Sequence, residues 1–257
     1  MNRTKIEWCD TVWNPVWGCL NDCSYCYARK IAKRFAFKIA EKEKEYCLKN
    51  NIRYSDISKD LEEFKPVFLE SNFNKKFPKN PSRIFVNSMS DIAFWDRDWM
   101  LRVFGKIVDN PQHQFLFLTK EPEVYRKFGF EKNCLLGVTV NKQRDVGRIR
   151  ILRGKKLLDK NRIFVSFEPL LENIDFHLNT DWVDFGVHTN PSLKDVDWII
   201  IGAQTRQYKP PKKEWIEGIM YNAKGFYIPV SIPVFLKNNL YKAYPDLPKL
   251  QEFPNDL

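Results

Sequence analysis

The chain has 257 residues, of which 44% are hydrophobic and 15% aromatic, and its formal net charge is +10. Twenty Phe, eight Trp and ten Tyr supply ample apolar surface for a packed core, so composition excludes disorder for most of the chain. With three histidines, ten glycines and neither a G-x-G-x-x-G nor a Walker loop, the sequence argues against a His-rich metal site and against the standard phosphate cradles.

Helix-like stretches and short apolar runs alternate along the chain. The first predicted helix covers about Tyr25–Asn50, because Ile31, Phe35, Ile39 and the run 42–46 recur near the helical period. The region 51–81, rich in Asn, Lys and Phe, interrupts this pattern and is predicted to be an irregular excursion, as is the region 171–195. The predicted strands are Arg83–Asn87, Gln114–Thr119, Cys134–Val140, Arg162–Phe167, Asp197–Gly202 and Pro233–Lys237. The predicted helices between them are Asp96–Asn110, Glu121–Phe128, Lys142–Arg153 and Lys213–Ala223.

The six predicted strands are almost continuously apolar instead of alternating with polar residues. This pattern is typical of strands that are covered on both faces of a parallel sheet. Strands that alternate with helices indicate βα units, so we predict an α/β fold with a parallel, barrel-like sheet. No linker or low-complexity tract divides the chain, so residues 1–257 are predicted to form a single domain.

Polar or ionisable side chains follow every predicted strand. In parallel barrels the functional residues lie at the carboxyl ends of the strands. Asn, Ser and Gly at such places also form turns, so each position taken alone has a structural alternative. Lys120, Glu168 and Lys237 are stronger candidates, because a charge at the end of a buried strand needs a partner or a ligand. The other candidates at these ends are Ser88, Ser90, Asp91, Thr139, Asn141 and Gln204.

The clearest feature is the run Cys19-Leu-Asn-Asp-Cys23-Ser-Tyr-Cys26, in which the cysteines have the spacing C-x3-C-x2-C. Iron–sulfur clusters are held by cysteine thiolates, and three ligands leave one iron open. Zinc is the alternative, but a structural zinc site needs a fourth ligand and usually a second C-x-x-C or a histidine. The isolated cysteines are expected in the core, and a second cluster built from them is the disfavoured alternative; they are Cys9, Cys47 and Cys134.

The cysteine run, with Tyr25 before its last cysteine, resembles the signature of the radical S-adenosylmethionine superfamily. Longer stretches resemble one phage- and prophage-associated branch of that superfamily, and the resemblance covers about residues 4–240. These stretches are Ile6–Cys19, Phe85–Asp91, Leu118–Pro122, Gly137–Asn141, Phe167–Leu171 and Trp198–Gly202. The chain departs from the branch at Cys9, where Thr is usual, and at Gly202-Ala-Gln204, where Gly-Gly-Glu is common. It also has fewer residues between its first two cluster cysteines than members often have.

The resemblance implies a partial (β/α)6-type parallel barrel with the Fe–S loop after the first strand. It also implies a 4Fe–4S cluster that is held by Cys19, Cys23 and Cys26 and binds S-adenosylmethionine at its free iron. In the superfamily, one-electron reduction cleaves the sulfonium and gives a 5′-deoxyadenosyl radical, which abstracts hydrogen from the substrate. A one-electron reductant such as flavodoxin or ferredoxin is therefore expected as a partner.

The same resemblance assigns roles to the strand-end residues. Tyr25 is expected beside the adenine, and Asp91 is the candidate acid near the methionyl amino group, together with Ser88 and Ser90. Lys120 and Glu168 are the catalytic candidates, Lys120 being suited to an anion and Glu168 also to the ribose hydroxyls. The remaining residues expected to bind the cofactor are Thr139, Asn141 and Gln204.

Each of these roles has a structural alternative. Asp91 could cap the helix that follows it. Lys120 and Glu168 could simply pair with each other across neighbouring strand ends. The tryptophans near the cysteine run are expected to cover a cluster rather than to stack on a base; they are Trp8, Trp13 and Trp17.

Positive charge is concentrated between Lys142 and Arg162, where nine Lys or Arg against two Asp give a net +7. A second basic group follows at Lys209–Lys213. This distribution suits phosphates, although a solvated helix face explains it almost as well. We therefore expect an enzyme that uses the adenosyl radical to modify, rearrange or repair a nucleic-acid base or nucleotide. Modification of a peptide, or a non-catalytic metal-binding module that holds nucleic acid, are the alternatives.

The hydropathy of the sequence gives an expectation about where in the cell the protein is found. No apolar run approaches the ~20 residues that span a bilayer. The first residues lack the apolar core of a signal peptide. We therefore expect a cytoplasmic protein with no membrane partner.

Overall fold

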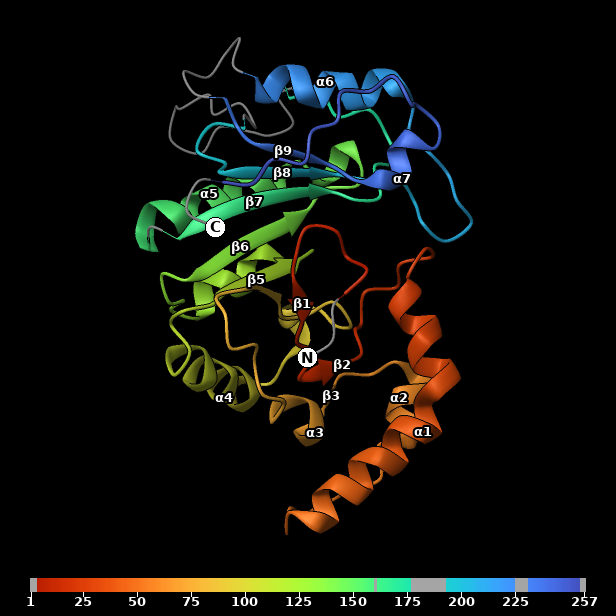
Figure 1. Ribbon diagram of the computed structural model, residues 1–257, viewed down its shortest axis with the longest axis vertical. Helices are drawn as coiled ribbons and strands as arrows, with labels where there is room; N and C mark the ends of the chain where they lie inside the picture. Colours follow the sequence, from red (N-terminus) through yellow and green to blue (C-terminus); the bar gives the residue numbers. More distant parts are fainter. Residues whose placement is uncertain (1–3, 160, 177–192, 225–230, 255–257) are drawn as a thin grey trace. The chain divides into compact units, whose positions relative to one another are not determined.

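The computed structural model describes residues 4–159, 161–176, 193–224 and 231–254 (Figure 1). The chain divides into two compact units, Met1–Leu118 and Thr119–Leu257, called unit 1 and unit 2 below. Among the described helices, none is long and apolar enough to cross a membrane.

Unit 1 combines a short parallel sheet with helices and one antiparallel strand pair. Strands β1, β4 and β5 are neighbours in that order, all parallel, with Thr11 beside Ile84 and Ile84 beside Phe115. Strands β2 and β3 pair antiparallel, with Val16 beside Phe68. The strands are β1 (Thr11–Val12), β2 (Val16–Trp17), β3 (Val67–Phe68), β4 (Arg83–Phe85) and β5 (Gln114–Thr119), whose last residue begins unit 2. The helices are α1 (Tyr27–Lys49), α2 (Ser58–Glu63), α3 (Glu70–Phe73), the 3-10 helix η1 (Ile92–Phe94) and α4 (Arg97–Val108).

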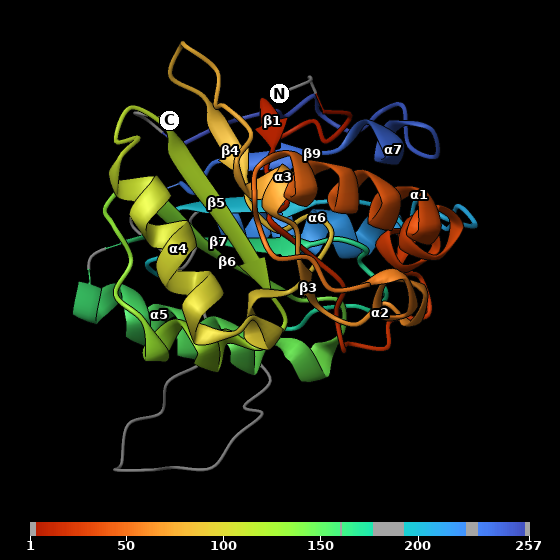
Figure 2. The ribbon, with the colours of Figure 1, turned by 90° about the horizontal axis from the view of Figure 1, so that it is seen from below.

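Helix α1 lies within a residue or two of its predicted bounds, but it buries a different face from the predicted one. The buried residues Ala28, Ala32, Ala36 and Ala40 recur every four positions and form a narrow strip of small side chains. The predicted apolar stripe was therefore wrong, since Ile31 and Phe35 from that stripe are exposed. Alanine keeps the helical backbone close to its neighbours, and α2 lies alongside α1 in both ribbon views (Figures 1 and 2).

The predicted excursion 51–81 contains α2, β3 and α3 and contributes to the core of unit 1. Leu61, Val67 and Leu69 from this region pack with Ala36 and Ala40 in one buried cluster. The region therefore supplies the surface against which α1 buries its alanines.

A second part of the core of unit 1 is aromatic and surrounds a lysine. Trp13 is buried, and its ring lies edge-on to Phe77 with 4.9 Å between the ring centroids. The Lys106 ammonium lies 5.3 Å from the Trp13 ring centroid and 4.9 Å from that of Phe77. Lys106 also donates hydrogen bonds to the backbone carbonyls of Phe73 and Lys75. These contacts join α4 to the chain that follows α3.

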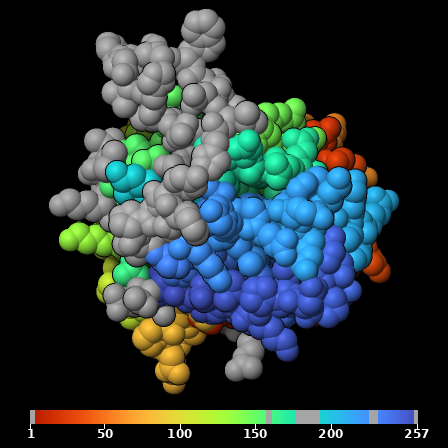
Figure 3. Space-filling view, turned by 90° about the horizontal axis from the view of Figure 1, so that it is seen from above, coloured from red at the N-terminus to blue at the C-terminus, as the bar shows by residue number. Residues whose placement is uncertain are grey.

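Unit 2 is built around four parallel strands, β6, β7, β8 and β9, which are neighbours in that order. They are β6 (Cys134–Thr139), β7 (Arg162–Phe167), β8 (Trp198–Ile201) and β9 (Val234–Leu236). The helices are the 3-10 helices η2 (Pro122–Lys127) and η3 (Gln143–Asp145), followed by α5 (Gly147–Asp159), α6 (Lys213–Ala223) and α7 (Asn238–Tyr241). Nearly every residue of the four strands is buried, as their continuous apolar sequences predict. Helix α6 and the C-terminal segment adjoin at the surface of this unit (Figure 3).

The α/β class with parallel strands is confirmed, and the bounds of β5, β7 and α6 match the predicted bounds. The predicted helix Glu121–Phe128 is the 3-10 helix η2, and the predicted helix from Lys142 begins only at Gly147, after η3. Most of the second predicted excursion, 177–192, lies outside the described residues. The single domain and the closure of the strands into one partial barrel stay predictions.

Candidate functional site

The cysteine loop, residues 19–26, joins β2 to α1 in unit 1. It follows β1, the first strand of the parallel sheet in chain order, and the short strand β2 of the antiparallel pair lies between β1 and the loop. Its entry is fixed by two backbone hydrogen bonds, from the Gly18 N–H to the Met89 carbonyl at 3.0 Å and from the Cys19 N–H to the Phe64 carbonyl at 2.9 Å. Gly18 has φ +102°, and a Cβ there would lie 1.9 Å from the Lys65 carbonyl oxygen, so only glycine fits without a shift of the backbone.

Two of the three sulfurs in the loop accept backbone hydrogen bonds. The Cys19 Sγ accepts from the Asn21 N–H at 3.4 Å, and the Cys26 Sγ accepts from the Arg29 N–H at 3.3 Å. Cys26 is the N-cap of α1, so its sulfur lies at the positive end of a 23-residue helix. Both features place positive partial charge beside a sulfur, and cysteine binds metal through its sulfur as a thiolate. All three cysteines, Cys23 included, are partly exposed and form no disulfide.

The surroundings of Cys19 disfavour its thiolate as long as no cation is bound in the loop. Burial raises the pKa of Cys19 to about 12, and the negative charges of Asp91, Cys23 and Cys26 add to the shift. A bound cation would reverse these contributions, because it stabilises the deprotonated ligands. Among the described residues, no three His, Cys, Asp or Glu side chains already converge as a metal site. The donor set of the loop consists of cysteine sulfurs and suits a group that is held by thiolates.

Apolar contacts cover one side of the cysteine loop. Cys19 and Cys26 pack with Trp17 against the cluster that contains Phe64 and Met89. Of the three tryptophans expected near the loop, Trp17 is the one that packs in this cluster. Trp8 lies against Phe85 and Trp13 belongs to the aromatic core around Lys106.

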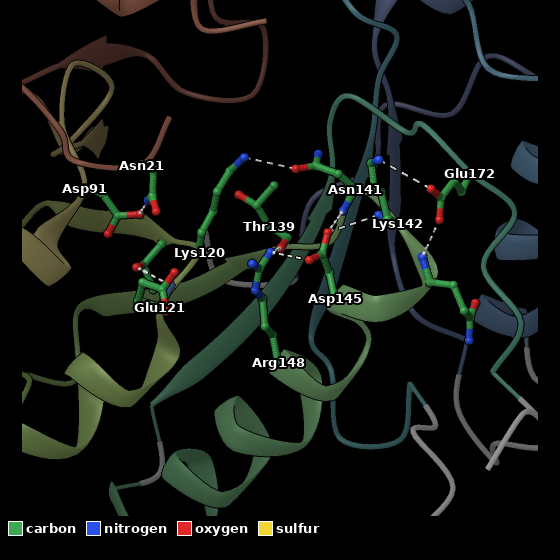
Figure 4. Close-up of polar contacts among 12 residues, drawn as sticks. Asn21, Asp91, Lys120, Glu121, Thr139, Asn141, Lys142, Asp145, Arg148 and Glu172 are labelled. Atoms are coloured by element: carbon green, nitrogen blue, oxygen red, sulfur yellow. Dashed lines mark hydrogen bonds and ion pairs between the residues drawn. The ribbon is translucent and has the colours of Figure 1, made fainter. Parts of the chain in front are cut away.

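Asp91 follows β4 and contacts the cysteine loop through Asn21. Its Oδ1 accepts from the Ala93 N–H at 3.1 Å and so caps η1, as the structural alternative predicted. Its Oδ2 accepts from the Asn21 Nδ2 at 3.0 Å (Figure 4). The buried carboxylate therefore links the end of β4 to the residues between Cys19 and Cys23.

The two serines before Asp91 have structural partners. The Ser88 hydroxyl donates to the Asn14 Oδ1 at 3.1 Å, and the Ser90 hydroxyl accepts from the Trp95 Nε1 at 3.1 Å. The Ser88 carbonyl accepts from the Tyr27 hydroxyl at 2.8 Å, which ties this turn to the first residue of α1. Tyr25 is half-buried within the cysteine loop. No contact of these residues tests their expected roles at a cofactor.

In unit 2, polar residues gather where β5 and β6 end. The Lys120 Nζ donates to the Asn141 Oδ1 at 3.1 Å (Figure 4). The Asn141 Nδ2 donates to the Pro169 carbonyl at 2.7 Å. Asp145 accepts from the Asn141 N–H and is paired with Arg148, which also donates to the Thr139 carbonyl. Asn141 is 2% exposed, so this network fixes the Lys120 ammonium by a buried amide.

Glu168 and Lys237 form an ion pair at the ends of β7 and β9. The Lys237 ammonium donates to the Glu168 Oε1, so Glu168 does not take Lys120 as its partner, and that alternative was wrong. Gly202 makes room for the pair, since a Cβ there would lie 3.0 Å from the Lys237 Cδ and 3.1 Å from the Glu168 Cγ. Gln204 turns away into its own loop and donates to the carbonyls of Arg206 and Gln207.

Sequence reasoning missed several residues that organise these sites. The Asn87 side chain donates to the Leu118 carbonyl at 2.7 Å and accepts from the Leu118 N–H at 3.1 Å. Asn14 accepts from both Ser88 and Met89, and Asn21 connects the loop to Asp91. Asparagine is common in turns, so nothing in the pattern separated these three from ordinary loop residues.

Carboxylates from elsewhere in unit 2 neutralise part of the charge of the basic segment 142–162. Its ion pairs are Lys142–Glu172, Arg148–Asp145, Arg153–Asp195 and Lys156–Asp197, with N···O distances from 2.6 to 3.5 Å. Lys155 is buried and donates to the Phe128 carbonyl at 2.8 Å. Because Glu172, Asp195 and Asp197 lie outside the segment in sequence, the net +7 overstated the charge that this surface presents.

One family model matches the chain, over residues 3–236, and its description is "Protein of unknown function (DUF5131)". No curated protein matches the chain. No solved structure matches it either.

Proposed function

We propose that this chain, which belongs to the DUF5131 family, is a radical S-adenosylmethionine enzyme that acts on a nucleic-acid base or nucleotide. The observation that carries the proposal is the cysteine loop, in which three cysteines outside any disulfide lie within eight residues directly before a long helix. Cys19, Cys23 and Cys26 would hold a 4Fe–4S cluster. When bound, such a cluster supplies the electron that cleaves S-adenosylmethionine to methionine and a 5′-deoxyadenosyl radical.

The chain itself would position and shield this cofactor. The N–H groups of Asn21 and Arg29 stabilise negative charge on two of the sulfurs, and the N-terminus of α1 adds a positive partial charge there. Trp17, Phe64 and Met89 exclude water from one side of the loop. Asp91 orients the loop through Asn21.

In unit 2, Lys120 and Glu168 remain the catalytic candidates of the proposal. Their bonds to Asn141 and Lys237 hold both side chains in fixed rotamers, which suits residues that bind or orient a ligand. The partial (β/α)6 barrel, the cytoplasmic location and a one-electron donor such as flavodoxin or ferredoxin belong to the same proposal.

Anaerobic reconstitution tests it. We expect about four iron and four sulfide per chain, an electron paramagnetic resonance signal after reduction, and 5′-deoxyadenosine that depends on dithionite. Cys26→Ala should lose the iron and the signal. Cys47→Ala is the matched control, because Cys47 is a buried cysteine of the same helix, and it should retain both.

Three results would overturn the proposal or its substrate class. Zinc in place of iron would leave a metal-binding module, and iron without 5′-deoxyadenosine would exclude the radical reaction. Mass spectrometry of DNA, RNA and peptides from cells with the wild-type chain or Cys26→Ala identifies the substrate. A modified peptide with unchanged nucleic acid would refute the nucleic-acid substrate.

A further inference from the structure

The first three turns of α1 carry apolar side chains that face solvent. Tyr27 is 47% exposed, Ile31 37%, Phe35 40% and Phe37 71%. The opposite side of the same turns is the buried strip of alanines. Apart from the Tyr27 hydroxyl, which donates to the Ser88 carbonyl, these exposed side chains therefore do not serve the core of unit 1.

Positive charge accompanies these aromatic residues. Lys30, Lys33, Arg34 and Lys38 are all exposed, and no acidic residue occurs between Tyr27 and Ala40. In the part of the chain that the structure describes, no carboxylate pairs with any of these four cations. The cations of α5 differ, since most of them have a carboxylate partner.

Cations and aromatic rings are interspersed around this exposed side. At 3.6 residues per turn, neighbours around the helix follow the order Lys33, Phe37, Lys30, Arg34, Tyr27 and Lys38. The Arg34 guanidinium carbon lies 5.3 Å from the Phe35 ring centroid, so cation and ring already stack. We call this surface the basic aromatic face.

We propose that the basic aromatic face binds single-stranded nucleic acid. Proteins that hold single strands combine cations that follow the phosphates with exposed aromatic rings on which unpaired bases stack. A membrane-binding helix separates its apolar side from its charged side, whereas here the two are mixed. The cores of protein interfaces are depleted in lysine, which supplies three of the four cations.

The position of the face relates it to the cysteine loop. Cys26 is the N-cap of α1, and Tyr27 to Lys38 spans about 17 Å of helix at 1.5 Å per residue. A strand bound along these turns would therefore lie within that distance of the loop. This inference rests on the proposed function for its link to catalysis. It adds that the nucleic acid is single-stranded and that the basic aromatic face binds it.

Fluorescence anisotropy on the full chain tests the inference, with labelled single strands of about 15 nucleotides in DNA and RNA and the matching duplexes. We expect single strands to bind more tightly than duplexes. Lys30→Glu with Arg34→Glu should weaken binding at least tenfold and lower the salt slope by about 1.4, because each phosphate contact contributes about 0.7. Phe35→Ala with Phe37→Ala should weaken binding about tenfold with an unchanged salt slope.

The control is Lys44→Glu with Lys49→Glu, which makes the same charge change on the last turns of α1. It should lower affinity less than threefold, and an equal loss would refute the assignment to this face. Absence of binding, or a preference for the duplex, would also refute it. Unchanged oligonucleotide binding together with lost reduction by an acidic flavodoxin would assign the face to an electron donor instead.

Iron content and 5′-deoxyadenosine formation are measured on the same variants, so the two proposals can fail separately. Site-specific binding without 5′-deoxyadenosine supports this face and refutes the radical enzyme. Formation of 5′-deoxyadenosine without any oligonucleotide binding refutes this face alone.

Discussion

Replacing Gly18 with alanine should destabilise unit 1. Gly18 has φ +102°, and holding a residue with a side chain in such a conformation costs about 1–3 kcal/mol. The added Cβ would lie 1.9 Å from the Lys65 carbonyl oxygen, 2.3 Å from its carbon and 2.7 Å from the Pro66 nitrogen. These are backbone atoms, so the chain before β3 must move, at a further cost of about 1–3 kcal/mol. The expected loss is therefore about 2–6 kcal/mol.

The same change should disturb the cysteine loop. The Gly18 N–H bonds the Met89 carbonyl and the Cys19 N–H bonds the Phe64 carbonyl, so moving residues 65–66 pulls on both anchors. Cys19 is partly buried in the native chain, and its thiol should react faster with a disulfide reagent in Gly18→Ala.

Urea denaturation followed by circular dichroism measures the stability, with Gly105→Ala as the control. Gly105 lies on the exposed side of α4 and has no atom within 4 Å of an added Cβ. Alanine there should stabilise the chain by about 0.5–1 kcal/mol, because it is the better helix former. A Gly18→Ala chain within about 0.5 kcal/mol of wild type would show that the Lys65 backbone is not held as described.

Three further changes test other contacts. Burial lowers the pKa of Lys106 to about 8 from its ordinary value of 10.5, so the unfolded chain binds more protons between these values. The free energy of unfolding should therefore rise as the pH increases from about 8 to 10, and Lys106→Met should flatten that rise. Equal slopes of the unfolding free energy against pH, measured by urea titration of both proteins, would contradict this. Tyr125→Phe should cost about 1–3 kcal/mol, because the buried hydroxyl donates to the Gly137 carbonyl and accepts from its N–H; a thermal midpoint equal to wild type would argue otherwise. Glu168→Gln should cost about 1–3 kcal/mol by weakening the pair with Lys237, and a double-mutant cycle with Lys237→Met that yields no coupling energy would exclude the pair.

The parallel strands could be predicted because a strand that is buried on both faces has an almost continuously apolar sequence. Gln114–Thr119 and Arg162–Phe167 are continuous apolar runs bounded by polar residues, and both became strands with the predicted bounds. Two-residue strands such as Thr11–Val12 carry no such signal, because they depend on neighbours that are distant in sequence. The cysteine loop was found by its spacing alone, but its place after β2 depends on the pairing of β2 with β3.

The buried face of α1 was mispredicted because large apolar side chains were taken as the core. Ala32 and Ala36 face the interior, where Leu61 and Leu69 need close approach rather than bulk. Both the small residues and the large apolar residues recur at the helical period, so periodicity alone does not show which face is buried. The tertiary contacts of the helix decide this.

Partners of charged residues were equally hidden. Glu168 and Lys237 are 69 residues apart, and Lys156 and Asp197 are 41 apart, so neither pair is visible as a local pattern. Counting charges along a segment gives its net charge in the sequence. It overstates the charge of the folded surface here, because some neutralising carboxylates come from other loops.

Asn87 shows how a strand can leave a sheet without exposing its neighbour. Strand β4 ends at Phe85, yet the side-chain amide of Asn87 both donates to and accepts from Leu118, as the backbone of a longer strand would. The backbone groups of Leu118 on β5 therefore keep hydrogen-bond partners one position beyond the end of β4. The chain after β4 can then turn away from the sheet toward Ser88 and Asp91. A carboxylate of the same shape has no N–H to offer the Leu118 carbonyl, so the divergence of the chain at this point depends on a single amide group.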